Sequence, residues 1–361
     1  MKVTISDIAK AANVAKSTVS KVLNDSPRIS LDTKLKVREI MKQMNYTPSS
    51  IATGLARQSS YNIGLLIDMS KESEFLNQFF YNIIGGIESV IGSLKYELTI
   101  ANVQHSGPEG HFLNRLVHSK RVDGLIANNS VLTDELSAEL DRLDFPYIAI
   151  GEIPAPGSWV DFDNAGGGSM LTGHLLAQGY GTIAFVGGQP EEKIFRHRYS
   201  GYTQALAQAG LPVRQELIAY GRADEHEGYR AALKLLTSTA PPDAMVCMTN
   251  YAAFGALQAA RELGVQVPAQ LGIAAFDEYP LSRYTTPPLT SLNIDTFKLG
   301  VCAGKLLMEQ LGEAGAMGAG KAGGAADSDS GRANNDKHGP VRHLLLEPEL
   351  IVRESTRRNR G

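Results

Sequence analysis

Residues 13–24 have the pattern of a tight turn followed by a short helix with two different faces. Val19, Val22 and Leu23 recur at the spacing of one buried helical stripe. The opposite side is polar and basic, and it consists of Lys16, Ser17, Lys21 and Asn24. Such a turn and helix are typical of a helix-turn-helix unit, whose second helix lies in the DNA major groove. A plain three-helix bundle with a solvated face is the alternative at this point.

The segments on either side supply two more helices for the same unit. An upstream apolar stripe is formed by Ile5, Ile8, Ala9 and Ala12. A third helix is predicted over residues 30–45, with Ser30 as its N-cap and Asp32 in its first turn. Its apolar stripe is formed by Val37, Ile40, Met41 and Met44. The first 47 residues are therefore predicted to fold as a small helical head.

The charge distribution separates this head from the rest of the chain. The formal net charge of −3 is the balance of about +6 in residues 1–60 and about −9 in the remaining residues. A basic end on an acidic body suits a polyanion that binds the end only. Cys247 and Cys302 give no disulfide framework, and no His or Cys cluster has metal-ligand spacing. No cofactor is expected. We expect a cytoplasmic chain, because no signal segment and no bilayer-spanning apolar run is present.

Residues 48–60 are predicted to be a hinge. Pro48 suits the first position of a helix capped by Thr47. The helix would be too short to be stable alone, and Gly54 weakens it by roughly another 1 kcal/mol. The hinge is therefore expected to become ordered only against a partner.

From Tyr61 onward, short apolar runs alternate with amphipathic stretches. The predicted buried strands are residues 63–67, 98–101, 124–127, 147–150, 183–186, 217–220, 244–247 and 271–275. The predicted helices between them include residues 79–91, 170–177, 199–209, 229–236 and 252–263. This alternation indicates α/β doubly wound parallel sheets, and the number of units fits two sheets better than one.

The order of these motifs resembles the lactose-repressor (LacI/GalR) family of bacterial transcription regulators. The resemblance is carried by residues 4–9 (Thr-Ile-Ser-Asp-Ile-Ala), 12–14, 17–24, 45–48 (Asn-Tyr-Thr-Pro) and 52–56 (Ala-Thr-Gly-Leu-Ala). It implies an all-α helix-turn-helix head followed by two doubly wound parallel-sheet subdomains like those of periplasmic binding proteins. It also implies a homodimer on a palindromic operator in double-stranded DNA. A small-molecule effector in the cleft of the core, expected to be a sugar or sugar derivative, would control it.

The domain boundaries follow from the same reasoning. The head is predicted at residues 1–47, the hinge at 48–60 and the core at 61–361. Within the core, one subdomain is predicted at 61–160 and 293–311 and the other at 161–292 and 340–355. A flexible insertion is predicted at 312–339. The insertion is rich in Gly, Ala, Ser and Asp and lacks apolar periodicity. Strands are predicted again at residues 343–346 and 350–352. The tail after residue 355 has no leucine heptads that would support a tetramer.

The resemblance assigns DNA contacts residue by residue. Base edges would be read by Lys16, Ser17 and Lys21, and phosphates would be contacted by Thr18, Ser20 and Asn24. Leu55 matches a leucine that paired hinge helices insert between base pairs in the minor groove, which kinks the duplex. Further predicted DNA contacts are Ser6, Tyr46, Ile51 and Arg57. Thr53 stands where the family often has arginine, so the hinge phosphate contact of that arginine is not expected here.

The effector contacts are predicted from strand ends and from the same resemblance. Asn250 and Asp277 each follow a predicted strand, and Arg198 matches a family arginine that faces the cleft. The remaining predicted contacts are Phe79, Phe80 and Asp163. Arginine, asparagine and aspartate offer hydrogen bonds to vicinal hydroxyls, and an aromatic face packs on a sugar ring. The alternatives are a surface ion pair for Arg198, a helix or turn cap for Asp277 and plain core positions for the two phenylalanines.

An enzyme is not expected, because the sequence contains no credible nucleophile and base constellation. Two other function classes stay open. One is a regulator that is controlled by a protein partner or has no effector, since Tyr251 and Ala223 depart from the residues usual at their positions. The other is a ligand-binding receptor without a role on DNA.

Overall fold

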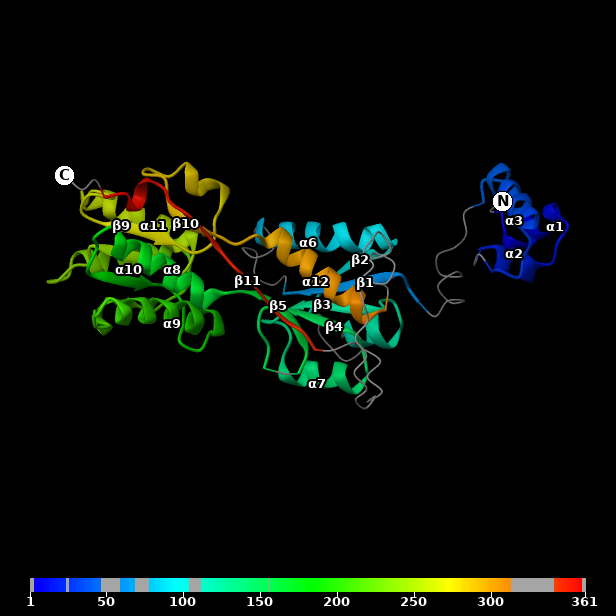
Figure 1. The fold of residues 1–361 in the computed structure, drawn as a ribbon, viewed down its shortest axis with the longest axis horizontal. Helices are drawn as coiled ribbons and strands as arrows, with labels where there is room; N and C mark the ends of the chain where they lie inside the picture. The colour runs from blue at the N-terminus through cyan, green and yellow to red at the C-terminus, as the bar shows by residue number, and fades with distance from the viewer. Residues whose placement is uncertain are drawn as a thin grey trace, which may run out of the picture. The chain divides into compact units, whose positions relative to one another are not determined.

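The computed structural model of the chain describes residues 3–23, 26–46, 59–68, 78–103, 112–154, 156–312 and 341–358. The side chains of Gln78 and Phe79 are not among the described parts. Most of the predicted hinge and nearly all of the predicted insertion therefore lie outside the described residues. The helices of the head, the two sheets and the helices around them can be followed in Figure 1.

The head contains the three predicted helices, α1 (Ile5–Ala12), α2 (Lys16–Leu23) and α3 (Leu31–Gln43). Its core is formed by the apolar stripes of the three helices, namely Ile8, Ala9, Ala12, Val19, Val22 and Val37. Ser30 caps α3, and its side chain accepts a hydrogen bond from the Thr33 amide at 3.4 Å. The predicted helical head is thus confirmed in its helices and in its core.

The rest of the chain is α/β. By its internal contacts the whole chain divides into two compact units. The first unit comprises Met1–Ser158 and Gly300–Arg342, and the second comprises Trp159–Leu299 and His343–Gly361. One six-stranded sheet has the order β11-β5-β4-β3-β1-β2. Its strands are β1 (Asn62–Ile67), β2 (Glu97–Asn102), β3 (Gly124–Asn128), β4 (Tyr147–Ile150), β5 (Ser158–Phe162) and β11 (His343–Leu346). The helical elements of this region are α6 (Gln78–Ile91), a π-helical turn at Leu113–His118, α7 (Asp134–Arg142) and α12 (Thr296–Gln310).

The other six-stranded sheet has the order β12-β10-β9-β8-β6-β7. Its strands are β6 (Ile183–Val186), β7 (Ile218–Ala219), β8 (Ala244–Cys247), β9 (Gly272–Ala275), β10 (Thr290–Asn293) and β12 (Glu349–Ile351). The helices are α8 (Asn164–Ala177), α9 (Lys193–Gln208), α10 (Glu225–Leu236) and α11 (Asn250–Glu262). Strands β7, β6, β8, β9 and β10 pair in parallel, and β12 pairs antiparallel with β10 at the edge.

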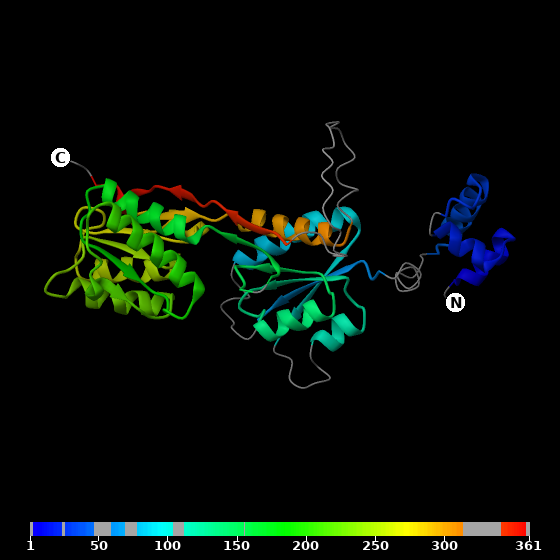
Figure 2. The same ribbon diagram turned by 60° about the horizontal axis from the view of Figure 1, so that its bottom comes forward.

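Helices cover both faces of this second sheet, as Figures 1 and 2 show. Successive residues of β8 point to opposite faces, so Ala244 and Val246 pack with residues of α8 and α9. Met245 and Cys247 pack with residues of α10 and α11 on the other face. A sheet buried on both faces explains why its strands read as continuous apolar runs rather than alternating ones. Among the described helices, none is both long and apolar enough to cross a membrane.

The structure corrects several sequence-based boundaries. Strands β5 and β10 and helices α7 and α12 were not predicted, and α8 begins at Asn164 rather than at residue 170. The glycine run at residues 166–168 has low helix propensity, and tertiary packing overrides it. Strand β2 is an edge strand, so Ile100 is exposed rather than buried as predicted.

Glycines allow helices α8 and α9 to pack at close range. A Cβ atom on Gly168 would overlap the carbonyl oxygen of Arg198, and one on Gly201 would overlap the carbonyl oxygen of Ala165. These contacts are backbone to backbone, so a side chain cannot rotate away to make room. The close approach fixes the position of the α9 turn that carries Arg198.

Gly201→Ala is expected to lower the free energy of unfolding by about 2 kcal/mol or more, because the added methyl group meets backbone atoms of α8. Gly173→Ala is the matched control, since an added methyl group at this position of α8 would have no heavy atom within 4 Å. That substitution is expected to stabilise the helix by about 0.5–1 kcal/mol. Urea unfolding monitored by circular dichroism measures both. Equal effects of the two substitutions would contradict the close-packing role of Gly201.

Candidate functional site

The exposed face of α2 carries residues predicted to read DNA. Ser17 and Lys21 are exposed and lie one helical turn apart, while Val19 and Val22 on the opposite side are buried. Lys16 is exposed at the start of the helix, and α2 contains no acidic residue. The helix therefore presents a small, polar and positively charged surface, and its apolar side chains point to the other side.

The turn before α2 is held by local hydrogen bonds, since the Asn13 amide donates to the Lys10 carbonyl at 3.1 Å and the Val14 amide donates to the Ala9 carbonyl at 3.0 Å. Asn13 takes the left-handed conformation with φ 53°, which asparagine tolerates better than most residues, and it lets α1 and α2 follow one another closely. At the start of α1, the amide and hydroxyl of Thr4 donate to the Asp7 carboxylate at 2.9 and 2.7 Å. These hydrogen bonds hold the pKa of Asp7 below its usual value. A depression at the turn is lined by Ser6, Ala9, Lys10, Asn13, Val14, Ala15 and Lys16, two of which are predicted DNA contacts.

The other predicted DNA contacts divide into two groups. Thr18 and Ser20 are half-buried on α2, and Tyr46 is half-buried against the core of the head. The remaining predicted contacts lie outside the described residues, and they are Asn24, Ile51, Leu55 and Arg57. The contacts of all these residues with DNA remain predictions.

A second candidate site is centred on Arg198, which lies on α9 and is 3% exposed. Its Nε donates to Asn164 Oδ1 at 2.9 Å, and its Nη1 donates to the carbonyl oxygen of Met248 at 2.5 Å. Nη1 and Nη2 donate to the two carboxylate oxygens of Asp277 at 3.4 and 3.0 Å. The guanidinium also lies over the Phe276 ring, 4.1 Å from its centroid. Arg198 is therefore a buried charge with three hydrogen-bonded partner residues and not a surface ion pair.

The strand ends of the second sheet bring these partners together. Met248 follows β8, and Phe276 and Asp277 follow β9. Because β8 and β9 are parallel neighbours, their carboxyl ends meet at one edge, where α/β proteins commonly bind ligands. Asp277 has φ 67°, a left-handed conformation that turns the chain directly after the strand. It is not a helix cap, and its carboxylate is directed to Arg198.

The asparagines near Arg198 have different environments. Asn164 is buried, accepts from Arg198 and donates from Nδ2 to the Phe162 carbonyl at 3.1 Å. Asn250 is the first residue of α11 and is 3% exposed, and its side chain makes no hydrogen bond with the described residues. Asp163 accepts from the Gly166 amide at 2.7 Å as the N-cap of α8. The Asp163 carboxylate is thus already engaged locally, and a role toward an effector remains a prediction.

In this site the charge of Arg198 is balanced by that of Asp277, and the Asp277 carboxylate is the more exposed of the two groups. The side chain of Arg198 is 4% exposed, whereas that of Asp277 is 28% exposed. Tyr251, the second residue of α11, is 36% exposed, and its ring centroid lies 6.0 Å from that of Tyr279. Burial, together with Tyr279 and the charge of Asp277, raises the pKa of Tyr251. An acceptor carboxylate, an amide and phenolic side chains thus lie in one neighbourhood of the second unit.

The two predicted aromatic contacts lie on α6, in the other unit. Phe80 is half-buried, and the side chain of Phe79 lies outside the described residues. Sequence reasoning did not identify the Met248 carbonyl or the Phe276 ring as partners of Arg198. A backbone carbonyl leaves no trace in the residue type, and Phe276 reads as an ordinary core residue.

The described residues offer no metal centre, since no group of three or more His, Cys, Asp or Glu side chains among them is placed to hold an ion. Burial raises the pKa of the Cys247 thiol to about 12, which suits a core residue rather than a nucleophile.

Asp277→Ala is expected to lower the free energy of unfolding by about 3 kcal/mol, because it leaves the Arg198 charge buried with fewer partners. The double variant Arg198→Met/Asp277→Ala is expected to lose less than the sum of the two single variants, since no unpaired charge remains. Chemical denaturation of the four proteins gives this coupling. If the losses in free energy of unfolding of the two single variants add up strictly in the double variant, Arg198 and Asp277 act independently and the predicted coupling is wrong.

Comparisons with known proteins agree with this architecture. Residues 4–49 match the family model of the bacterial regulatory proteins of the lacI family. Residues 172–356 match the family model of the periplasmic binding protein-like domain. The catabolite control protein A of Priestia megaterium is 32% identical over 317 residues, which cover 86% of this chain and 93% of that protein. The transcriptional repressor PurR of Yersinia pestis is 31% identical over 312 residues, which cover 85% of this chain and 90% of that protein.

Solved structures show the same fold over nearly the whole chain. A complex of the transcriptional regulator CelR with cellobiose has a TM-score of 0.68 and 25% identity, and the match covers 98% of this chain and 100% of that one. A lac repressor dimer bound to operator and the anti-inducer ONPF has a TM-score of 0.76 and 24% identity, with 99% of each chain covered. The relatives are transcriptional regulators rather than enzymes, as the sequence analysis predicted. This chain is a member of the lacI family of bacterial transcriptional regulators.

Proposed function

We propose that the chain is a repressor that binds a palindromic operator as a homodimer, and that a neutral sugar bound at the Arg198–Asp277 pair controls this binding. The observation that carries the effector part is the buried Arg198 with Asp277 at the carboxyl ends of β8 and β9. Two structural neighbours support the proposal, since one is a repressor dimer on its operator and the other is a regulator with bound cellobiose.

The DNA part of the proposal uses the exposed face of α2. Lys16, Ser17 and Lys21 would contact base edges, and the polar residues around them would contact phosphates. Leu55 would act as the minor-groove wedge of the hinge. Two heads would occupy half-sites about one helical turn apart or slightly less. The head would comprise residues 1–47, the hinge residues 48–60 and the core residues 61–361.

The chemistry around Arg198 favours a neutral, hydroxylated effector. Four hydrogen bonds use four of the five N–H groups of its guanidinium, and Asp277 balances its charge. A phosphate or carboxylate ligand would therefore have to displace Asp277 from Arg198 or lie beside its negative charge. Hydroxyl groups can instead donate to Asp277 and accept from Asn250. Tyr251 adds an aromatic face for a sugar ring.

Effector binding and operator binding would be coupled by about 1–3 kcal/mol, the range usual for two linked sites. The effector contacts would also include Phe79, Phe80 and Asp163. The protein would work in the cytoplasm, where operator DNA is accessible. If no sugar acts as the effector, the alternative is a regulator that responds to a protein partner.

Selection of binding sites from random DNA is expected to yield a symmetric sequence bound by the full-length chain. Lys21→Ala should relax the preference at one position in each half-site by about 1–3 kcal/mol, because it removes one base contact. Lys36→Ala, on the exposed surface of α3, is the control of equal charge and should keep the preference. Equal weakening on all sequences would instead make Lys21 a phosphate contact.

Thermal shift of the full-length chain with a panel of neutral and phosphorylated sugars tests the effector. A neutral sugar is expected to raise the melting temperature and to change operator affinity by about 5- to 150-fold. Arg198→Met should abolish both effects because it removes the charge that orients Asp277. No response to any neutral sugar would contradict the proposal. A response to phosphorylated sugars alone would contradict the argument from charge.

A further inference from the structure

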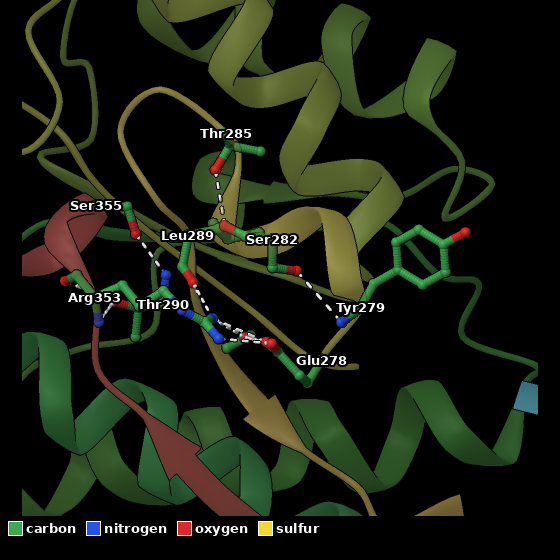
Figure 3. A network of polar contacts seen from close by, with 9 residues as sticks. Glu278, Tyr279, Ser282, Thr285, Leu289, Thr290, Arg353 and Ser355 are labelled. Atoms are coloured by element: carbon green, nitrogen blue, oxygen red, sulfur yellow. Dashed lines mark hydrogen bonds and ion pairs between the residues drawn. The ribbon is translucent and has the colours of Figure 1, made fainter. Parts of the chain in front are cut away.

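The residue next to Asp277, Glu278, lies in a second ion pair, which is largely shielded from solvent and is shown in Figure 3. Arg353 Nη1 donates to Glu278 Oε2 at 2.9 Å, and Nη2 donates to Oε1 at 2.6 Å. The two side chains are only 14% and 13% exposed. In the surface pair Arg230–Glu227 of the same unit, the side chains are 64% and 32% exposed and Arg230 Nη1 donates to Glu227 Oε1 at 2.9 Å. The Glu278–Arg353 pair is therefore more buried, and its two-pronged contact restricts the geometry further.

Further hydrogen bonds hold the two side chains of this pair in place. Arg353 Nη1 also donates to the carbonyl oxygen of Leu289 at 2.7 Å and contacts Ser291 Oγ at 3.1 Å. The Ser291 hydroxyl in turn donates to the Glu278 carboxylate. Glu278 thus has one partner on β10, Ser291, and one on the C-terminal segment, Arg353. Figure 3 shows the Arg353 guanidinium directed at the Glu278 carboxylate.

The backbone of the C-terminal segment is fixed to the same sheet. The Arg353 amide donates to Thr290 Oγ1 at 2.8 Å, and the Thr290 amide donates to Ser355 Oγ at 2.8 Å. The Ser355 hydroxyl donates to the carbonyl oxygen of Ile273, on β9, at 2.6 Å. The segment that presents Arg353 is therefore anchored to the strand that leads to Asp277.

The backbone at Asp277 needs such support. A left-handed conformation is uncommon in residues other than glycine, although aspartate tolerates it better than most, and it persists when the surrounding structure determines it. On one side of Asp277, the Phe276 amide donates to the Cys247 carbonyl at 3.1 Å, and on the other the Glu278 amide donates to the Leu292 carbonyl at 2.8 Å. The ion pair with Arg353 fixes the side chain of Glu278 in addition. Adjacent carboxylates are thus directed to two different arginines.

We propose that the Glu278–Arg353 pair is a positioning pair for the effector site. By fixing Glu278, Arg353 holds Asp277 in the conformation that places its carboxylate on Arg198. The C-terminal segment, which follows the predicted insertion in the sequence, is in this way connected to the Arg198 site through one residue. The importance of this connection for effector binding rests on the proposed function, whereas the positioning itself does not.

The positioning can be tested without a ligand by NMR of the full-length chain with ¹⁵N-labelled arginine. The probe is the Nε–H signal of Arg198, assigned by its absence in Arg198→Lys. Glu278→Gln and Arg353→Lys are expected to move this signal, because Asp277 and its bonds to Arg198 shift. Arg230→Gln, which removes the surface pair, should leave the signal in place.

A merely structural role would lower stability but leave the Arg198 signal of the folded protein unchanged. An unchanged signal in Glu278→Gln or Arg353→Lys therefore overturns the proposal. Glu278→Gln leaves Arg353, which is largely shielded from solvent, without its carboxylate partner, so this variant is the more exposed to misfolding. Arg353→Lys keeps the positive charge and loses only the two-pronged geometry, and it decides the question if the other variant does not fold.

Effector affinity gives the functional readout. The neutral sugar that stabilises the parent chain is expected to bind Glu278→Gln about tenfold more weakly. The reason is that Glu278 is coupled to its neighbour Asp277, which would contact the effector. Arg230→Gln should bind within about twofold of the parent, as surface substitutions do. Parent-like affinity in a folded Glu278→Gln would contradict the functional part. If no sugar binds the parent chain, the proposed effector fails, while the Arg198 signal still decides the positioning.

Discussion

Burial of the Arg198 guanidinium is the constraint that the second unit has to satisfy. A charged group removed from water is strongly destabilising unless it is paired and hydrogen-bonded. Asn164, Met248 and Asp277 supply these bonds from three separate segments, and the Phe276 ring covers the guanidinium. The start of α8, the end of β8 and the end of β9 must therefore all be in place before the charge is stable.

The packing around the pair explains how such placement is reached. Helices α8 and α9 approach closely because Gly168 and Gly201 leave room for backbone contact. This approach brings Asn164, at the start of α8, to Arg198 on α9. On the other side, the left-handed turn at Asp277 redirects the chain after β9, and Arg353 fixes the following residue, Glu278. Polar site and apolar core are thus parts of one packing arrangement, since the same helices cover the sheet.

The comparison of sequence and structure is instructive at the candidate site. Arg198, Asn250 and Asp277 were predicted from strand ends and from a family resemblance, and the structure brings Arg198 and Asp277 into direct contact. The Asn164 contact, the Met248 carbonyl and the Arg353–Glu278 pair were not predicted as parts of the site. Their partners are separated by at least 34 residues in the chain, so no local pattern connects them. The effector role of all these residues remains a proposal.

The sequence by itself determined the features that depend on local periodicity. The stripes of Val19, Val22 and Val37 predicted the helical head, and the apolar runs predicted most strands of the two sheets, because burial of one face imposes a regular spacing. Tertiary structure alone decided which strands lie at an edge, as for β2, and whether the glycine run of α8 is helical. It also decided which carboxylate pairs with which arginine. These outcomes depend on contacts between distant segments, whose energies exceed local propensities and leave no periodic signal in the chain.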